Sequence, residues 1–148
     1  MSTRVPAAEI REQCLCLGLQ RAARLLARRY DEAFRPLGLT SWQFSLLVSL
    51  STPEPPSIGR IAQLLDGDRT TITACLKPLS RRGLLKTTAS PRDRREHLVQ
   101  LTPRGRALLA RALPLWEVAQ LVTHEELGRS SVRLRGELRK LGAASAHG

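Results

Sequence analysis

The stretch SIGRIAQLLDGDRTTITACLKPLSRRGLL, residues 57–85, decides the fold of this chain. Ser57 is a typical N-cap for a short helix, and the DGDR turn at residues 66–69 ends that helix. A second helix is expected from about Thr70 to Arg82. Its apolar stripe consists of Ile72, Leu76 and Leu79. Two short helices around a tight turn that contains glycine predict a helix-turn-helix.

The stretch SPRDRREHLVQLTPRG, residues 90–105, carries a dense positive charge. Gly83 ends the preceding helix, and the segments LLKTTAS and EHLVQL lie on either side of three arginines within four residues. The alternation of apolar and polar residues places Val99 and Leu101 on one face of a strand. The pattern predicts a two-stranded hairpin, or wing, with the arginines at its tip.

A long helix is predicted before this lobe. From about Ile10 to Phe34, apolar residues recur with a 3,4,3,4 spacing that lines up one heptad-like seam. The seam consists of Cys16, Leu19, Ala23, Leu26 and Tyr30. A shorter helix, capped by Thr40 or Ser41, is expected to follow it.

A further helical region is predicted after the wing. Thr102 is expected to cap a helix whose first residue is Pro103, where the missing N–H costs nothing. Pro114 is expected to bend or restart this helix. Its apolar seam consists of Leu108, Ala112, Leu115, Ala119 and Val122. The chain then continues as a basic amphipathic helix.

Charge and composition narrow the class of protein. The chain of 148 residues has a net charge of +11, and residues 57–104 carry ten basic side chains against four acidic ones, a local net charge of +6. This charge favours a polyanionic partner, either nucleic acid or an anionic membrane surface, and charge alone does not choose between them. A sequence-tolerant nucleoid or RNA-binding protein would carry the same charge. Because no apolar run is long enough for a membrane span or a signal peptide, we expect a cytoplasmic protein with no membrane partner.

The sequence offers no constellation for catalysis or metal binding. The three cysteines, Cys14, Cys16 and Cys75, are too few and too poorly spaced for a disulfide framework or a zinc site. Paired catalytic carboxylates, a phosphate loop and a Ser/Cys–His arrangement are also missing. We therefore expect no metal, no cofactor and no enzymatic activity.

The two quoted stretches together resemble the winged helix-turn-helix of the MarR family of bacterial transcription regulators, above all in the motifs LSRRGLL, DRR and LTPRG. The resemblance implies a mainly α-helical fold with a small β wing, in one domain over residues 1–148. The DNA-binding lobe would span residues 40–102, and residues 10–35 and 103–142 would form the dimerisation helices. A homodimeric repressor on a palindromic operator in double-stranded DNA is implied as well.

The predicted DNA contacts fall into two groups. A helix fits the major groove, where threonine, lysine and arginine side chains reach base edges. The candidates there are Arg69, Thr70, Thr71, Thr73 and Lys77. Arginines of the wing are expected in the minor groove, where the resemblance implies that Asp93 helps to orient Arg95. The wing candidates are Arg92, Asp93, Arg94 and Arg95. The alternative is a solvated face whose arginines pair locally with Asp93 and Glu96.

The resemblance also implies a small-molecule effector. MarR-like regulators usually release DNA when an aromatic or other lipophilic ligand enters a pocket between the dimer helices and the DNA-binding lobe. By their positions, the expected lining residues are Tyr30, Phe34, Trp42 and Trp116. The alternative is that these aromatic residues are ordinary core.

The peroxide-sensing branch of the same family suggests another trigger. In that branch a reactive cysteine lies at the start of the first helix, and Cys16 occupies the matching position. Two tyrosines normally hydrogen-bond this cysteine; one matches Tyr30, whereas Gln20 replaces the other. Cys14 would then be a resolving thiol or simply a tolerated residue. On an apolar seam, a protonated Cys16 that only packs is the alternative.

Overall fold

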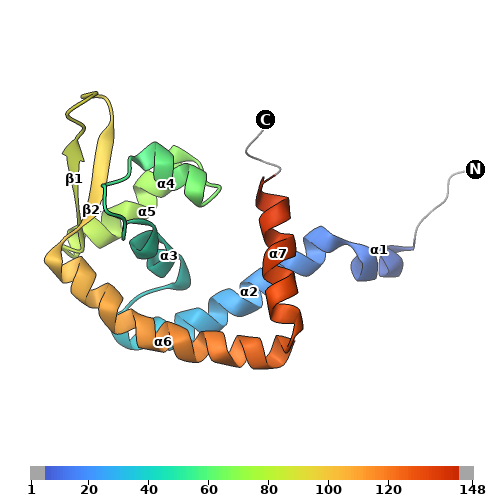
Figure 1. Ribbon diagram of the computed structural model, residues 1–148. Helices are drawn as coiled ribbons and strands as arrows, with labels where there is room; N and C mark the ends of the chain where they lie inside the picture. Colours follow the sequence, from blue (N-terminus) through green and yellow to red (C-terminus); the bar gives the residue numbers. More distant parts are fainter. Residues whose placement is uncertain (1–5, 144–148) are drawn as a thin grey trace, which may run out of the picture.

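The computed structural model describes residues 6–143 of the chain. It is mainly helical, with one antiparallel hairpin, as the sequence predicts. Figure 1 shows a lobe of short helices and the hairpin on one side, and long helices that run beneath it and away from it. The elements are α1 (Ala7–Gln13), α2 (Leu15–Phe34), the 3-10 helix η1 (Arg35–Leu37), α3 (Ser41–Ser49), α4 (Ile58–Leu64), α5 (Arg69–Arg81), β1 (Leu85–Ala89), β2 (His97–Leu101), α6 (Pro103–Leu127) and α7 (Ser130–Ala143). Among residues 6–143, no helix combines the length and the apolar character needed to cross a bilayer.

The helix-turn-helix, α4 and α5, lies where the sequence predicts it. The hydroxyl oxygen of Ser57 accepts a hydrogen bond from the N–H of Arg60 at 3.1 Å and so caps α4. Asp68 caps α5, because its Oδ1 accepts the N–H of Thr71 at 2.8 Å. With Asp68 as the cap, α5 begins at Arg69, one residue before the predicted start.

The wing is a regular antiparallel pair. Leu85 lies opposite Leu101, and the register continues to Ala89 opposite His97. Leu101 and Val99 are buried, which confirms the predicted apolar face of the second strand. The start of α6 is pressed against the base of the wing, since a β-carbon on Gly105 would stand 1.9 Å from the carbonyl oxygen of Leu84.

One apolar core joins the lobe to the long helices. Its fully buried large side chains come from α2, α3, α4, α5 and β2, and they are Phe34, Leu46, Leu47, Ile61, Ile72, Leu79 and Val99. Leu108 and Ala112 of α6 complete it. Burial of each such side chain stabilises the fold by about 1.5–3 kcal/mol, so the core holds α5 at a set orientation to α2 and α6.

The prediction of a single first helix from Ile10 to Phe34 is wrong. The backbone is extended at Cys14 (φ −72°, ψ 106°), and this residue separates α1 from α2. The Sγ atom of Cys14 accepts the N–H of Leu17 at 3.5 Å, so the thiol takes the place of an N-cap. No residue of α1 is buried by the described residues 6–143, so α1 is not anchored in the core and little holds it in line with α2.

Pro114 does not restart the helix after the wing, contrary to that part of the prediction. Helix α6 is continuous from Pro103 to Leu127, and Figure 1 shows it curving along its length. Because Pro114 and Ala110, four residues earlier, are both exposed, water can satisfy the carbonyl that loses its intrahelical partner. Pro78 is likewise exposed within α5, which runs unbroken past it.

Candidate nucleic-acid interface

Helix α5 has one buried and one open side. Ile72, Leu76 and Leu79 face the core, as predicted. On the open side a shallow groove follows the helix, lined by Arg69, Thr70, Thr73, Ala74 and Lys77. We call these five residues the recognition face. The structure thus brings four of the five predicted major-groove residues together, and all five residues of the face are exposed.

Thr71, the fifth predicted residue, does not line this groove. Two residues beyond Arg69, it is rotated by about 200° around the helix axis. Its hydroxyl donates to Oδ2 of Asp68 at 2.6 Å, and its N–H donates to Oδ1 of the same side chain at 2.8 Å. Both hydrogen bonds lower the pKa of Asp68, and the bond from the Thr71 hydroxyl contributes more than the bond from the Thr71 N–H. Thr71 therefore serves the helix cap.

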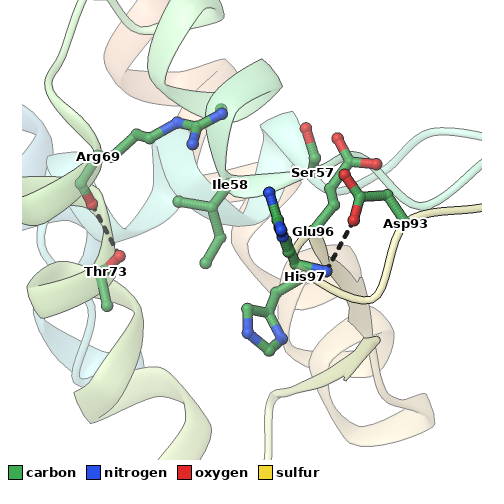
Figure 2. Close-up of a pocket in the computed structure, with 9 residues that line it drawn as sticks. Ser57, Ile58, Arg69, Thr73, Asp93, Glu96 and His97 are labelled. Atoms are coloured by element: carbon green, nitrogen blue, oxygen red, sulfur yellow. Dashed lines mark hydrogen bonds between the residues drawn. The ribbon is translucent and has the colours of Figure 1, made fainter. Parts of the chain in front are cut away.

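Arg69 turns away from the axis of α5 toward the start of α4. Its guanidinium lies so close to Gly59 that a β-carbon there would stand 2.5 Å from Nη2. Figure 2 shows this side chain extending above Ile58, across from the tip of the wing. The hollow between α4, α5 and the wing has a volume of about 340 Å³. Its lining includes Ser57, Gly59, Arg69, Asp93, Arg95 and His97.

Main-chain hydrogen bonds shape the tip of the wing. The Oδ1 atom of Asp93 accepts the backbone N–H of Arg95 at 2.9 Å, and the carbonyl of Asp93 accepts the N–H of Glu96 at 2.9 Å. The N–H of Ser90 donates to the carbonyl of Glu96 at 2.8 Å and closes the loop. Asp93 thus holds the backbone at Arg95, and in this indirect way it orients the Arg95 side chain.

The wing arginines are open to solvent. Arg92, Arg94 and Arg95 are all exposed. Within residues 6–143 the ion pairs join Arg29 to Glu126, Arg35 to Glu32 and Lys140 to Glu137, and none of them involves a wing arginine. The alternative in which these arginines pair with Asp93 and Glu96 therefore finds no support in the described part of the chain. Their charge is available to an external anion.

Sequence reasoning missed three residues of this region. Ala74 lies in the middle of the recognition face, one turn after Thr70. Gly59 makes room for Arg69. Arg82, just after α5, donates from Nη1 to the carbonyl of Gly38 at 2.7 Å and from Nη2 to that of Leu37 at 3.1 Å, which ties α5 to the end of η1. The helical spacing of Ala74 was available as a signal, whereas the contacts of Gly59 and Arg82 depend on the fold.

The predicted ligand residues lie in different surroundings. Phe34 is fully buried and stacks on Phe44 with ring centroids 4.5 Å apart. Tyr30 and Trp116 are partly buried against the same core, and Trp42 is 39% exposed. The hydroxyl of Tyr30 donates to Gln120 of α6. Burial raises the pKa of Tyr30. In the single chain, Phe34 is a core residue.

The two neighbouring cysteines lie at the junction of α1 and α2. Cys16 is exposed, and its Sγ accepts a hydrogen bond from Nε2 of Gln20 at 3.4 Å. Gln20, which replaces one of the expected tyrosines, is thus itself a donor to the sulfur. Cys14 is half-buried, with its Sγ at the first turn of α2. Cys75 is half-buried against the core.

Comparison with known proteins agrees with this architecture. A family model described as a winged helix DNA-binding domain matches residues 39–105. The M. tuberculosis transcriptional regulator MosR, solved in complex with DNA, is 36% identical; the match covers 90% of this chain and 97% of MosR, with a TM-score of 0.81. The transcriptional repressor CouR, solved with p-coumaroyl-CoA, is 32% identical over 97% of this chain and 98% of CouR, with a TM-score of 0.77.

Three further relatives support the assignment. A MarR-family transcriptional regulator from Rhodococcus sp. RHA1 is 25% identical over 88% of this chain and 96% of that one, with a TM-score of 0.77. In Bacillus subtilis, the uncharacterized HTH-type transcriptional regulator YwoH is 34% identical over 84 residues, 57% of this chain and only 61% of YwoH. The organic hydroperoxide resistance transcriptional regulator of B. subtilis is 28% identical over 104 residues, 70% of this chain and 71% of that protein. Given its winged helix-turn-helix and these relatives, the chain belongs to the MarR family of DNA-binding transcriptional regulators.

Proposed function

We propose that this protein is a homodimeric repressor that binds a palindromic operator in double-stranded DNA and releases it when a small lipophilic or aromatic ligand binds. The observation that carries the proposal is the recognition face of α5 beside a wing with three exposed, unpaired arginines within the described chain. The solved complex of MosR with DNA supports the DNA-binding part of the proposal. As a regulator of transcription, the protein would act in the cytoplasm.

The proposed contacts divide between the two grooves. An exposed helix face of this width fits the major groove, and we assign Thr70, Thr73 and Lys77 to it. Arg94 and Arg95 are assigned to the minor groove, whose narrow A·T-rich stretches attract arginine. Arg69 lines the hollow between α4, α5 and the wing, and Arg92 lies in the loop between β1 and β2. We assign both side chains to phosphates. The role of Asp93 is to shape the loop that carries Arg95.

Exposed apolar side chains support the homodimer. They occur on the long helices away from the lobe, where a single chain leaves them in water, and they include Leu15, Leu19, Leu25, Val118, Leu121, Val132, Leu138 and Leu141. Leu15 and Leu19 of α2 and three leucines of α7 also line a groove of about 380 Å³. Contiguous apolar surface of this kind is costly in water and marks an interaction site. A second copy of the chain would cover it.

The ligand part of the proposal rests on the junction of α2 and α6. Tyr30 and Trp116 are partly buried there, between the long helices and the lobe. The solved complex of CouR with p-coumaroyl-CoA shows that a relative of this fold holds an aromatic thioester. Entry of a ligand beside Phe34 would require the core to repack. Because Phe34 and the buried residues of α5 belong to the same core, this repacking would move α5.

Selection of bound duplexes from random DNA by the purified protein tests the function. We expect inverted half-sites with centres about 10 bp apart, and a preference over random DNA of about a thousandfold or more. Binding without such a preference would replace the proposal with a sequence-tolerant nucleoid or RNA-binding role. Lipophilic carboxylic acids and their thioesters are then added to the complex, and release is followed by fluorescence anisotropy.

A second candidate function is a thiol switch for organic peroxide. It is favoured by the exposed Cys16 with Gln20 on its sulfur, and by the likeness to the B. subtilis organic hydroperoxide resistance regulator. The Cys16 thiolate would attack the peroxide and yield a sulfenic acid and an alcohol, after which Cys14 could form a disulfide with release of water. Oxidation would disturb the apolar seam of α2.

Stoichiometric organic hydroperoxide distinguishes the two triggers. The wild type, Cys16→Ser and Cys14→Ser are treated in parallel, and operator release is followed together with thiol mass. Release of the wild type but not of Cys16→Ser would establish the peroxide switch. If the wild type stays bound and unmodified, Cys16 belongs to the packing of α2 and the ligand remains the trigger.

A further inference from the structure

We propose that Thr73 and Ala74 recognise the 5-methyl group of thymine in each operator half-site. The inference deepens the proposed function and depends on it, since it requires that α5 enter the major groove. It concerns which chemical group of the DNA the centre of the recognition face selects.

The first step is the state of the Thr73 hydroxyl. Its single proton is donated to the carbonyl oxygen of Arg69, one turn earlier, at 2.7 Å. Figure 2 shows the hydroxyl directed at that carbonyl. A threonine held in this way has no proton for the N7 or O6 acceptors of guanine. Its oxygen can still accept a hydrogen bond, and the apolar group that the side chain offers is its γ-methyl.

The second step is the neighbour of Thr73. Ala74 offers only a methyl group and lines the same groove. Thr70 and Lys77 stand one turn away on either side of this pair, so the pair occupies the middle of the face. The recognition face therefore has an apolar centre, with polar groups toward its two ends.

The third step matches this centre to a base edge. In the major groove, thymine is the base that presents a methyl group, and alanine and threonine methyl groups are its usual partners. Lys77 at one end remains free to donate to guanine or to a phosphate. A half-site with thymine under the centre of α5 therefore fits this face, and a guanine there would leave its acceptors without a donor.

The test uses a duplex selected from random DNA by the wild-type protein. Each thymine is replaced singly by deoxyuridine, which removes only the 5-methyl group. At one or two positions in each half-site we expect affinity to fall about fourfold, as for the loss of one buried methyl group. Affinities are measured by fluorescence anisotropy at fixed salt.

Variants at position 73 provide the matched comparison. Thr73→Ser keeps the hydroxyl and loses the methyl, so its preference for thymine over uracil should fall clearly below that of the wild type, with the remainder due to Ala74. Thr73→Val keeps the methyl and loses the hydroxyl, so it should still prefer thymine. Ala74→Gly should also lower the ratio of the affinity for the thymine duplex to that for the uracil duplex. This ratio is the quantity measured because a loss of stability in α5 affects both affinities alike.

Three results would overturn the inference: no thymine whose replacement weakens binding, full discrimination by Thr73→Ser, or lost discrimination by Thr73→Val. These failures are distinct from failure of the proposed function. A protein that selects a specific duplex yet ignores the methyl group loses only this inference, whereas a protein that selects no duplex loses the operator function itself.

Discussion

The guanidinium group of Arg69 lies over the backbone of Gly59, where a β-carbon would stand 2.5 Å from Nη2 and 3.1 Å from Nε. The side chain of Arg69, the first residue of α5, thus lies across the start of α4. Gly59 leaves room for it because glycine has no β-carbon. This contact directs Arg69 toward the hollow between α4 and the wing.

Gly59→Ala should displace Arg69 and weaken operator binding. Because the obstructing atoms are the end of a flexible side chain, the free energy of unfolding should change by no more than about 0.5 kcal/mol. Operator affinity should fall by roughly 1 kcal/mol, as for a lost arginine contact. A double-mutant cycle with Arg69→Ala, measured by anisotropy and thermal unfolding, checks this. Additive losses of affinity would contradict a shared mechanism.

Arg95→Ala should weaken operator binding by about 1–3 kcal/mol and reduce the slope of log K against log salt by about 1. The guanidinium is exposed and makes no ion pair with the described residues, so its removal should leave the thermal stability unchanged. Asp93→Ala should reproduce part of the loss, because it removes the acceptor of the Arg95 N–H. Unchanged affinity for both variants across salt concentrations would remove the wing from the interface.

Leu121→Asp should dissociate the dimer without unfolding the subunit. Leu121 is 59% exposed in the single chain, so a charge there disturbs only an interface formed with another copy. Leu115→Asp is the contrasting variant: Leu115 packs against the core, and a charge there should lower the stability of the subunit itself. Sedimentation and circular dichroism separate these effects. A wild type that sediments as a monomer would contradict the proposed dimer.

The cap of α5 should contribute a pH-dependent stability. Hydrogen bonds from Thr71 lower the pKa of Asp68 below its ordinary value of 3.8. A group whose folded-state pKa is lowered stabilises the protein above its unfolded pKa, and that contribution is lost as the pH falls through the folded pKa. Asp68→Asn retains an N-cap acceptor but does not titrate. The stability difference between wild type and Asp68→Asn should therefore shrink in acid below pH 3.8; a constant difference from pH 7 to the acid limit would contradict this.

Local interactions explain why much of the lobe could be predicted. Ser57 and Thr102 cap helices through hydrogen bonds to residues three positions away, and the apolar stripe of α5 follows from the helical period. The wing likewise follows from alternation, with Val99 and Leu101 buried on one face. In each case the groups that interact lie close together in the chain, so their spacing carries the information.

The helix boundaries outside the lobe were harder to predict. The predicted helix runs from Ile10 through Cys14, although its apolar seam starts only at Cys16. The helix breaks at Cys14, where α1 has no buried residue to hold it in line with α2. Pro114 was expected to bend or restart α6, but the helix is not restarted and continues past this residue. The carbonyl of Ala110, which lacks its intrahelical partner, belongs to an exposed residue that water can reach. Periodicity reports which face is apolar, whereas a break depends on whether packing and water can offset the lost hydrogen bonds.

The sequence by itself determined the winged helix-turn-helix, the basic charge of its outer surface and most of the residues that line the recognition face. Only the tertiary structure decided what those residues can offer to a partner. Thr71 and Thr73 look equivalent in the sequence, but one hydroxyl serves Asp68 and the other the Arg69 carbonyl. Arg69 turns toward Gly59, ten positions away, and Phe34 joins the core by stacking on Phe44. Such outcomes depend on three-dimensional distances between side chains and on competition for each donor, which linear spacing does not encode.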